Sequence, residues 1–84
     1  MQTNEQMIQG TLRCVDFARI HDVMMTLGWQ WGEPRERHTP SQQELRQHAE
    51  SLLRRVLAEA ENRGSYWIRT GGFRAEFDGT ALRL

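Results

Sequence analysis

Arginine and tryptophan side chains near the C-terminus have the clearest capacity for chemistry in this sequence. Arg69, Arg74, Arg83 and Trp67 lie in three short segments in which apolar and polar residues alternate. A guanidinium group is planar and donates paired hydrogen bonds to phosphate or carboxylate, and an indole ring offers a stacking surface. These four side chains form a candidate binding site if the three segments pair as one sheet.

Two glycine-containing turns predict how those segments pair. Gly71-Gly72 and Asp78-Gly79 are both favoured two-residue hairpin turns. Taken as such, they give a three-stranded antiparallel meander of residues 66–70, 73–77 and 80–84. One face of that meander is continuously apolar and consists of Tyr66, Ile68, Phe73, Ala75, Phe77, Leu82 and Leu84.

The same register predicts a row of three arginines on the opposite face. Arg69 pairs with Arg74, and Arg74 pairs with Arg83, while Trp67 and Glu76 occupy the neighbouring row. Like charges that lie directly opposite each other destabilise a sheet, by up to about 1 kcal/mol. The row is therefore the candidate functional feature of this chain.

Three interpretations of the row are open. It is an anion site, in which the arginines bind phosphate and Trp67 is a stacking platform. It is a protein interface, because Trp and Arg are enriched among the residues that dominate binding energy. Or it is neutralised within the chain, by Glu76, by the N-terminal segment or by the charged loop 33–38. That loop adds Arg35 and Arg37 to the candidate contacts.

The sequence offers little support for catalysis or metal binding. His21, His38 and His48 have no further histidine or cysteine at the spacing of a metal site. Cys14 is the single cysteine and is interpreted as a free buried thiol rather than a nucleophile. We expect no metal and no cofactor, and a small enzyme is the weakest of the functional alternatives.

The elements that must position these residues are two helices. Asp16 is a suitable N-cap for a helix that reaches Leu27 and stops at Gly28. Thr39, followed by Pro40, predicts the start of a long helix that ends at Gly64. Its apolar residues follow one stripe, made of Leu45, Ala49, Leu52, Leu53, Val56, Leu57 and Ala60.

The remaining segments carry weaker signals. Residues 1–15 are polar and are predicted to be a loose tail or lead-in. Trp29-Gln30-Trp31 fits a short strand. The predicted fold class is therefore α+β, with the N-terminal tail preceding a single domain over residues 16–84, in which two helices pack on the apolar face of the meander.

Composition narrows the class of partner. The 84 residues carry eleven basic and eleven acidic side chains, for a formal net charge of zero. A protein that coats nucleic acid would be strongly basic. No apolar run is long enough to span a membrane, and nothing resembles a signal peptide, so we expect a cytoplasmic protein without a membrane partner. So small a core also favours association with a copy of itself.

Several segments resemble a group of small phage and prophage proteins. They are DFARIH at 16–21, LGWQW at 27–31, TP at 39–40, ELR at 44–46 and GGFRA at 71–75. The resemblance covers about four fifths of the chain and leaves residues 1–15 outside it. It implies an accessory protein that acts by binding, for example an inhibitor of host defence of the anti-CRISPR kind.

We therefore expect a non-enzymatic protein that binds a host or phage partner protein. The predicted contacts are the arginine row with Trp67 and Glu76, together with Arg35 and Arg37. The first alternative is a binder of a nucleotide or a nucleic acid, with the same arginines on its phosphates.

Overall fold

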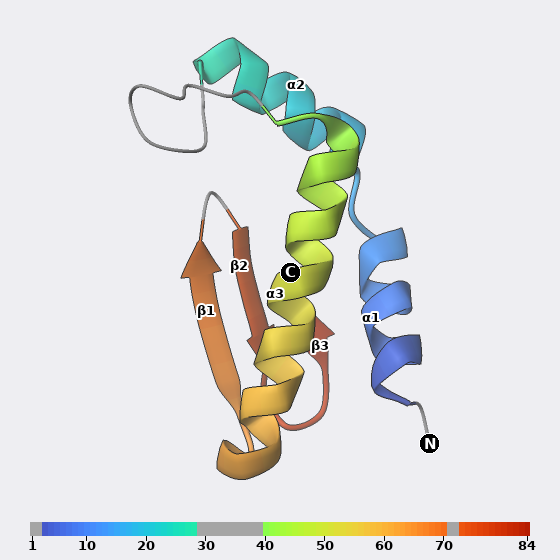
Figure 1. Cartoon of the computed structure of the whole chain (residues 1–84), viewed down its shortest axis with the longest axis vertical. Helices are drawn as coiled ribbons and strands as arrows, with labels where there is room; N and C mark the ends of the chain where they lie inside the picture. Colours follow the sequence, from blue (N-terminus) through green and yellow to red (C-terminus); the bar gives the residue numbers. More distant parts are fainter. Residues whose placement is uncertain (1–2, 29–39, 71–72) are drawn as a thin grey trace.

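The structure is a computed structural model, and it describes residues 3–28, 40–70 and 73–84. The chain has an α+β fold, in which helices precede a three-stranded antiparallel sheet with the strand order β1-β2-β3. Helix α3 crosses one face of this sheet, α1 lies beside β3, and α2 lies at the start of α3 (Figure 1). The elements are α1 (Asn4–Arg13), α2 (Phe17–Leu27), α3 (Gln42–Arg63), β1 (Tyr66–Thr70), β2 (Phe73–Phe77) and β3 (Leu82–Arg83).

Helix α1 replaces the loose tail that was predicted for residues 1–15. Thr3 accepts a hydrogen bond from the backbone N–H of Gln6, and the Gln6 side chain accepts one from the backbone N–H of Thr3. This capping box fixes the start of the helix. Ile8 and Leu12, one turn apart, are buried against the rest of the molecule. The helix forms because those two side chains pack into the core. The polar residues around them made this amphipathic pattern difficult to recognise in the sequence.

Helix α2 has the ends that the sequence predicts. The carboxylate of Asp16 accepts from the backbone N–H of Arg19 at 3.1 Å. Gly28 adopts a left-handed conformation with φ of +68°, which glycine occupies without a steric cost. Phe17 and Met24 are buried, whereas Val23 and Leu27 are exposed. The segment 29–31, predicted as a short strand, lies outside the described residues.

Helix α3 begins two residues later than predicted. Its N-cap is Ser41, which accepts from the backbone N–H of Glu44 at 3.2 Å, and the predicted cap Thr39 lies outside the described residues. Both positions begin a capping pattern, but the one at Ser41 places a carboxylate in the first turn, where the helix dipole favours it. Gly64 ends the helix as expected.

The register of the sheet agrees with prediction on one side only. Strands β1 and β2 pair as expected, with Ile68 opposite Ala75 and Arg69 opposite Arg74. Strand β3 is displaced by two residues, so that Glu76, rather than Arg74, lies opposite Arg83. The predicted arginine row is therefore wrong at its third member.

The cause of this displacement is the side chain of Asp78. Its carboxylate accepts from the backbone N–H groups of Thr80 and Ala81, each at 2.8 Å. An aspartate that bonds in this way prefers to precede the turn rather than to lie within it. The central residues become Gly79, with φ of +98°, and Thr80. Moving the turn by one residue moves the pairing of β3 by two.

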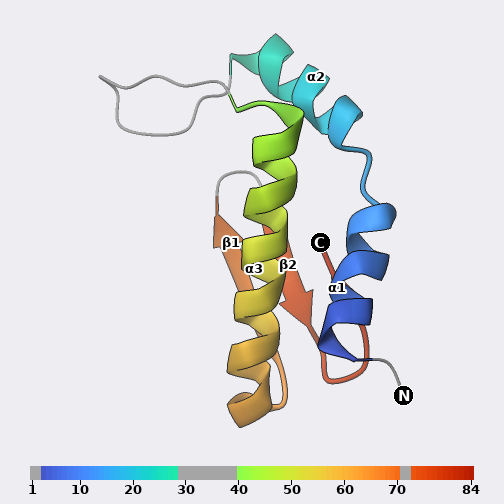
Figure 2. The ribbon, with the colours of Figure 1, turned by 45° about the vertical axis from the view of Figure 1, so that its right-hand side comes forward.

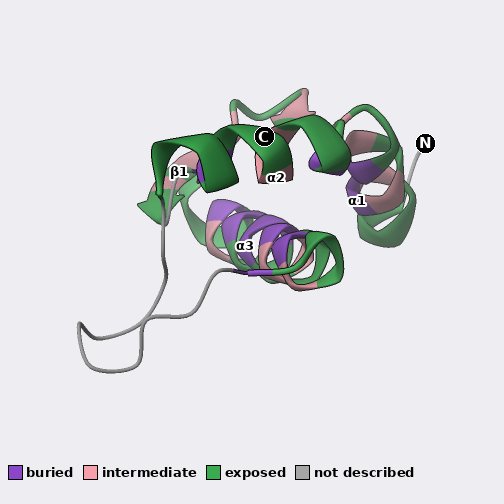
Figure 3. Ribbon diagram, turned by 90° about the horizontal axis from the view of Figure 1, so that it is seen from above, coloured by how far each residue is buried: buried purple, intermediate pink, exposed green. Residues whose placement is uncertain are grey.

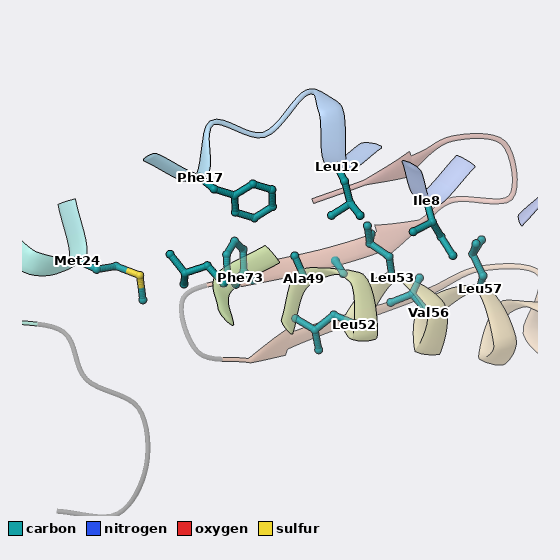
Figure 4. Packing of buried hydrophobic residues seen from close by; sticks show 12 residues of the cluster. Ile8, Leu12, Phe17, Met24, Ala49, Leu52, Leu53, Val56, Leu57 and Phe73 are labelled. Carbon is teal, nitrogen blue, oxygen red and sulfur yellow. The ribbon is translucent and has the colours of Figure 1, made fainter. Parts of the chain in front are cut away.

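The core lies between α3 and the sheet, and α1 and α2 complete it. The seven apolar residues of the α3 stripe are all buried, and Figure 3 shows the buried residues concentrated on the inner sides of α3 and α1. Ile8 and Leu12 point from α1 toward α3, and Phe17 lies near Phe73 of the sheet, with ring centroids 6.4 Å apart (Figure 4). The apolar face of the sheet is thus covered, and its other face is left for polar side chains.

Candidate functional site

The face of the sheet turned away from α3 carries five of the seven predicted contact residues. Residues alternate between the two faces of a strand, and paired residues share a face. The observed pairings therefore put Trp67, Arg69, Arg74, Glu76 and Arg83 on this face. The turned view in Figure 2 shows α3 on one face of the sheet and α1 beside β3. We call this surface the open face.

Trp67 and Arg74 form the centre of the open face. Trp67 lies opposite Glu76 on the neighbouring strand and is 59% exposed. The guanidinium carbon of Arg74 lies 4.9 Å from the centroid of the indole ring. This distance is within the range of a cation–π interaction, which is worth about 0.5–1 kcal/mol at an exposed site. The contact holds Arg74 against the ring and presents an aromatic and cationic surface to a partner.

Glu76 and Asp78 neutralise part of the predicted row. Arg83 lies 3.2 Å from Asp78 and 3.8 Å from Glu76, and Arg74 lies 3.8 Å from the other carboxylate oxygen of Glu76. Exposed ion pairs contribute about 0–1 kcal/mol each, so these contacts orient the arginines more than they stabilise the fold. Neutralisation within the chain, one of the three interpretations of the sequence, therefore applies to Arg74 and Arg83.

Arg69 differs from the other two arginines. It lies opposite Arg74, a like charge, and its side chain is exposed. Within residues 3–28, 40–70 and 73–84, no carboxylate forms an ion pair with it. Arg69 is therefore the guanidinium of the open face that the described part of the chain leaves available to an external group.

Asp78 remains ionised under ordinary conditions. The backbone N–H groups of Ala81 and Thr80 donate to its carboxylate and lower its pKa below the usual 3.8, and the charge of Arg83 lowers it further. These hydrogen bonds favour the charged form because a carboxylate accepts more strongly than a carboxylic acid. Asp78 therefore sets both the position of β3 and the charge beside Arg83.

Two of the predicted contact residues cannot be placed on this surface. Arg35 and Arg37, and the acidic side chains of the loop 33–38, lie outside the described residues. The same is true of Trp29 and Trp31.

A second polar cluster joins α1 to α3, and sequence reasoning missed it. Arg54 contacts Glu5 at 2.8 Å and Glu50 at 2.7 Å. The hydrogen bonds from Arg54 lower the pKa of Glu5, with a smaller contribution from Gln9. Only the pair Glu50–Arg54 was visible in the sequence, as residues one turn apart. The contact with Glu5 was not predicted, because the segment that contains Glu5 was predicted to be a tail.

A groove of about 550 Å³ runs between α1 and β3. Met7 and Val15 line it from one side, Leu82 and Leu84 from the other, and Cys14 contributes an exposed thiol. The prediction of a buried thiol at Cys14 was therefore wrong, because this residue caps the C-terminus of α1 and lines the groove instead of the core. Thr11 bridges the groove, as its hydroxyl oxygen lies 2.8 Å from the carbonyl oxygen of Met7 and 3.3 Å from that of Leu82.

The described ranges also bear on metal binding and on membrane insertion. No group of three or more His, Cys, Asp or Glu side chains within them could hold a metal ion. Across those same residues, no helix has the length and the apolar character that crossing a membrane requires. Comparisons with models of protein families, with curated proteins and with solved structures found no match.

Proposed function

We propose that this chain is a non-enzymatic accessory protein that binds a partner protein through the open face of its sheet. The observation that carries the proposal is the exposed indole of Trp67 with Arg74 stacked on it, on a face that no described helix covers. Trp and Arg are the residues most enriched at the energetic centres of protein interfaces. The pair is held rigid by two adjacent strands, which lowers the entropic cost of binding.

The chemistry of the open face favours a protein over a polyanion. Glu76 and Asp78 place negative charge among the arginines, and the chain as a whole has no net charge. A surface of mixed sign suits a partner that carries both acidic and basic side chains. A nucleic acid would instead be attracted by a field of one sign.

The resemblance to small phage and prophage proteins gives the proposal its biological setting. We place the protein in the cytoplasm of an infected or lysogenic cell, where it binds a host or phage protein. Inhibition of a host defence complex, as by anti-CRISPR proteins, is the role that best fits a small binding module of this kind. This part of the proposal rests on the resemblance, whereas the binding surface rests on the geometry.

Photo-crosslinking tests the proposal directly. A photoreactive amino acid replaces Glu76 on the open face in one protein and Arg55 on the outer side of α3 in another, each expressed in the phage's host. We expect a specific crosslinked protein from the first position only. The affinity of this chain for the purified partner should then fall at least tenfold in the variants Trp67→Ala and Arg74→Glu. Arg55→Glu, the matched charge reversal, should bind as the wild type does. A partner that is insensitive to both open-face variants contradicts the proposal.

Phosphate binding is the second candidate, and Arg69 is the observation that favours it. Arg69 and Arg74 lie opposite each other, and Arg69 has no carboxylate partner among the described residues. Two adjacent guanidinium groups suit one phosphate. Titration with short oligonucleotides and cyclic nucleotides at two salt concentrations tests it, because phosphate contacts weaken steeply with salt. Absence of binding at low salt removes this candidate.

A further inference from the structure

The two edges of the sheet differ in what accompanies them. Strand β3 lies beside α1, and the hydroxyl of Thr11 reaches the carbonyl of Leu82 on its outer side. Strand β1 forms the opposite edge over five residues. No described helix or strand lies beyond it, as Figure 1 shows. An edge strand of this length presents a row of backbone N–H and C=O groups that is able to pair with another strand.

The Thr11 contact identifies which groups of β1 point outward. Because the carbonyl of Leu82 points away from β2, the pair Phe77–Leu82 does not exchange hydrogen bonds across β2 and β3. The backbone groups of Phe77 therefore point to β1, and bonded and non-bonded pairs alternate from there. Along β1, Ile68 is bonded to Ala75, while Trp67 and Arg69 belong to non-bonded pairs. Trp67 and Arg69 thus direct their backbone N–H and C=O groups to the open edge.

We propose that a second copy of this chain pairs antiparallel with the outer edge of β1 and forms a homodimer with one continuous sheet. The pairing places Trp67 opposite Arg69 of the second copy, Arg69 opposite Trp67 of the second copy, and Ile68 opposite its own counterpart. In this register the residues with outward backbone groups lie opposite each other, so each of the two pairs exchanges both of its hydrogen bonds. The edge is therefore complementary to itself.

The side chains select this register over its neighbours. A two-fold axis through Arg69 would place two like charges directly opposite each other, which destabilises a sheet. An axis through Trp67 would stack the two indoles and leave both Arg69 side chains without an aromatic partner. The proposed axis, through Ile68, gives each Arg69 an indole of the other copy to stack on. It supplies Arg69 with the partner that the described residues of its own chain do not provide.

The inference goes beyond the proposed function and does not depend on which partner the open face binds. In the dimer the two open faces join across the axis, so that two Trp67–Arg74 pairs lie on one continuous surface. A partner that is itself dimeric would meet both copies at once, and its affinity would rise through the linkage of two binding events. The apolar faces of the two sheets also become continuous, because Ile68 of one copy contacts Ile68 of the other on the face that α3 covers.

The mass of the full chain as a function of concentration tests the proposal first. Sedimentation equilibrium should show a transition from 9.9 kDa to twice that mass. Arg69→Pro removes an outward N–H without breaking a bond to β2, a position at which edge strands tolerate proline. This variant should remain a monomer, with an unchanged circular dichroism spectrum. Arg69→Ala keeps the N–H and loses the stacking, so its dimer should dissociate several-fold more readily.

Cysteine crosslinking tests the register. In a Cys14→Ser background, Ile68→Cys places two thiols in a non-bonded antiparallel pair. The Cα atoms of such a pair lie about 4.5 Å apart, which is within the range of a disulfide. Thr70→Cys is the matched control, because its two copies would lie about 13 Å apart along the strands. We expect a disulfide-linked dimer from the first variant and none from the second.

Three results would overturn the proposal. The wild-type chain could remain a monomer at the highest concentration it tolerates, or Arg69→Pro could dimerise as the wild type does. A dimer that is crosslinked by Thr70→Cys and not by Ile68→Cys would exclude the proposed register. If Ile68→Cys fails to fold, the response of the mass to Arg69→Pro still decides whether this edge forms the interface.

Discussion

The two edges of this sheet are protected to very different degrees. Strand β3 has only two residues, and α1 lies alongside it, with the hydroxyl of Thr11 on its outer carbonyl. Strand β1 has five residues and no described neighbour beyond it. A covered edge prevents unwanted strand pairing, whereas an open one invites it. Helix α1, in a segment that was predicted to be a loose tail or lead-in, therefore covers one edge of the sheet and leaves the other edge able to pair.

Detaching α1 should have the largest effect on the covered edge. Leu12 is 2% exposed and anchors the helix in the core. We expect Leu12→Ala to lower the free energy of unfolding by about 2–5 kcal/mol, because it removes buried methyl groups and leaves a cavity. Urea denaturation followed by circular dichroism measures the loss. Leu27→Ala, at a position that is 74% exposed, is the control and should change stability by less than about 0.5 kcal/mol. Equal losses in the two variants would show that α1 is not anchored as described.

A smaller change tests the contact between α1 and β3 alone. Thr11→Val keeps the shape of the side chain and removes the hydroxyl that bridges Met7 and Leu82. We expect a loss of about 1 kcal/mol in the free energy of unfolding, the usual net value of a hydrogen bond. The same denaturation experiment measures it. A variant as stable as the wild type would mean that the hydroxyl contributes nothing to holding the covered edge.

The charge of Asp78 tests how β3 is held at its start. Asp78→Asn keeps an oxygen that accepts from Thr80 and Ala81 and removes the charge beside Arg83. The folded-state pKa of Asp78 lies below 3.8, so the charged form stabilises the fold above that pH. The stabilisation is lost as the pH falls through the folded-state pKa.

Denaturation at a series of pH values should show a higher free energy of unfolding for the wild type than for the variant at neutral pH. The difference should shrink below pH 3.8. Glu5 titrates in both proteins, so its contribution cancels in the difference. A difference that persists unchanged in strong acid would assign the effect to something other than the charge.

Amide hydrogen exchange distinguishes the two sides of β1 in the unmodified protein. In dilute monomer, the amide of Ile68 should exchange slowly because it is bonded to β2, and the amides of Trp67 and Arg69 should exchange quickly. As the concentration rises and the dimer forms, the last two should become protected. Slow exchange at Trp67 and Arg69 in dilute solution would instead show that another part of the chain covers this edge.

Regular patterns made most of the architecture predictable from the sequence. The alternation in β1 and β2 and the turn at 71–72 gave the correct pairing, and the spacing of apolar residues located the buried stripe of α3. Two features that shape the fold escaped prediction. Helix α1 is held by Ile8 and Leu12 among glutamines, so its amphipathic pattern is short. The turn before β3 is set by side-chain hydrogen bonds of Asp78, which a turn dipeptide does not reveal.

The sequence predicted correctly which face of the sheet carries the candidate site. It did not predict correctly which residues of that face lie opposite each other. Because β3 moved by an even number of residues, every side chain stayed on its predicted face, and only its neighbours changed. Arg83 lies beside Glu76 and Asp78 instead of Arg74. The electrostatic cost predicted for the row is therefore largely absent, and only the pair Arg69–Arg74 retains it.

The turn at Asp78–Ala81 also bears on how such a protein could evolve. Sliding the turn by one position re-pairs β3 by two residues and leaves the inner and outer faces as they were. A lineage could therefore rewire the salt bridges around Arg83 by changes at the turn alone, without disturbing the layer under α3. Insertion of a single residue within β3 would instead turn Arg83 to the inner face of the sheet, the face on which Leu82 now packs. We therefore expect the fold to tolerate substitutions at the turn and to tolerate poorly any change of length within the strand.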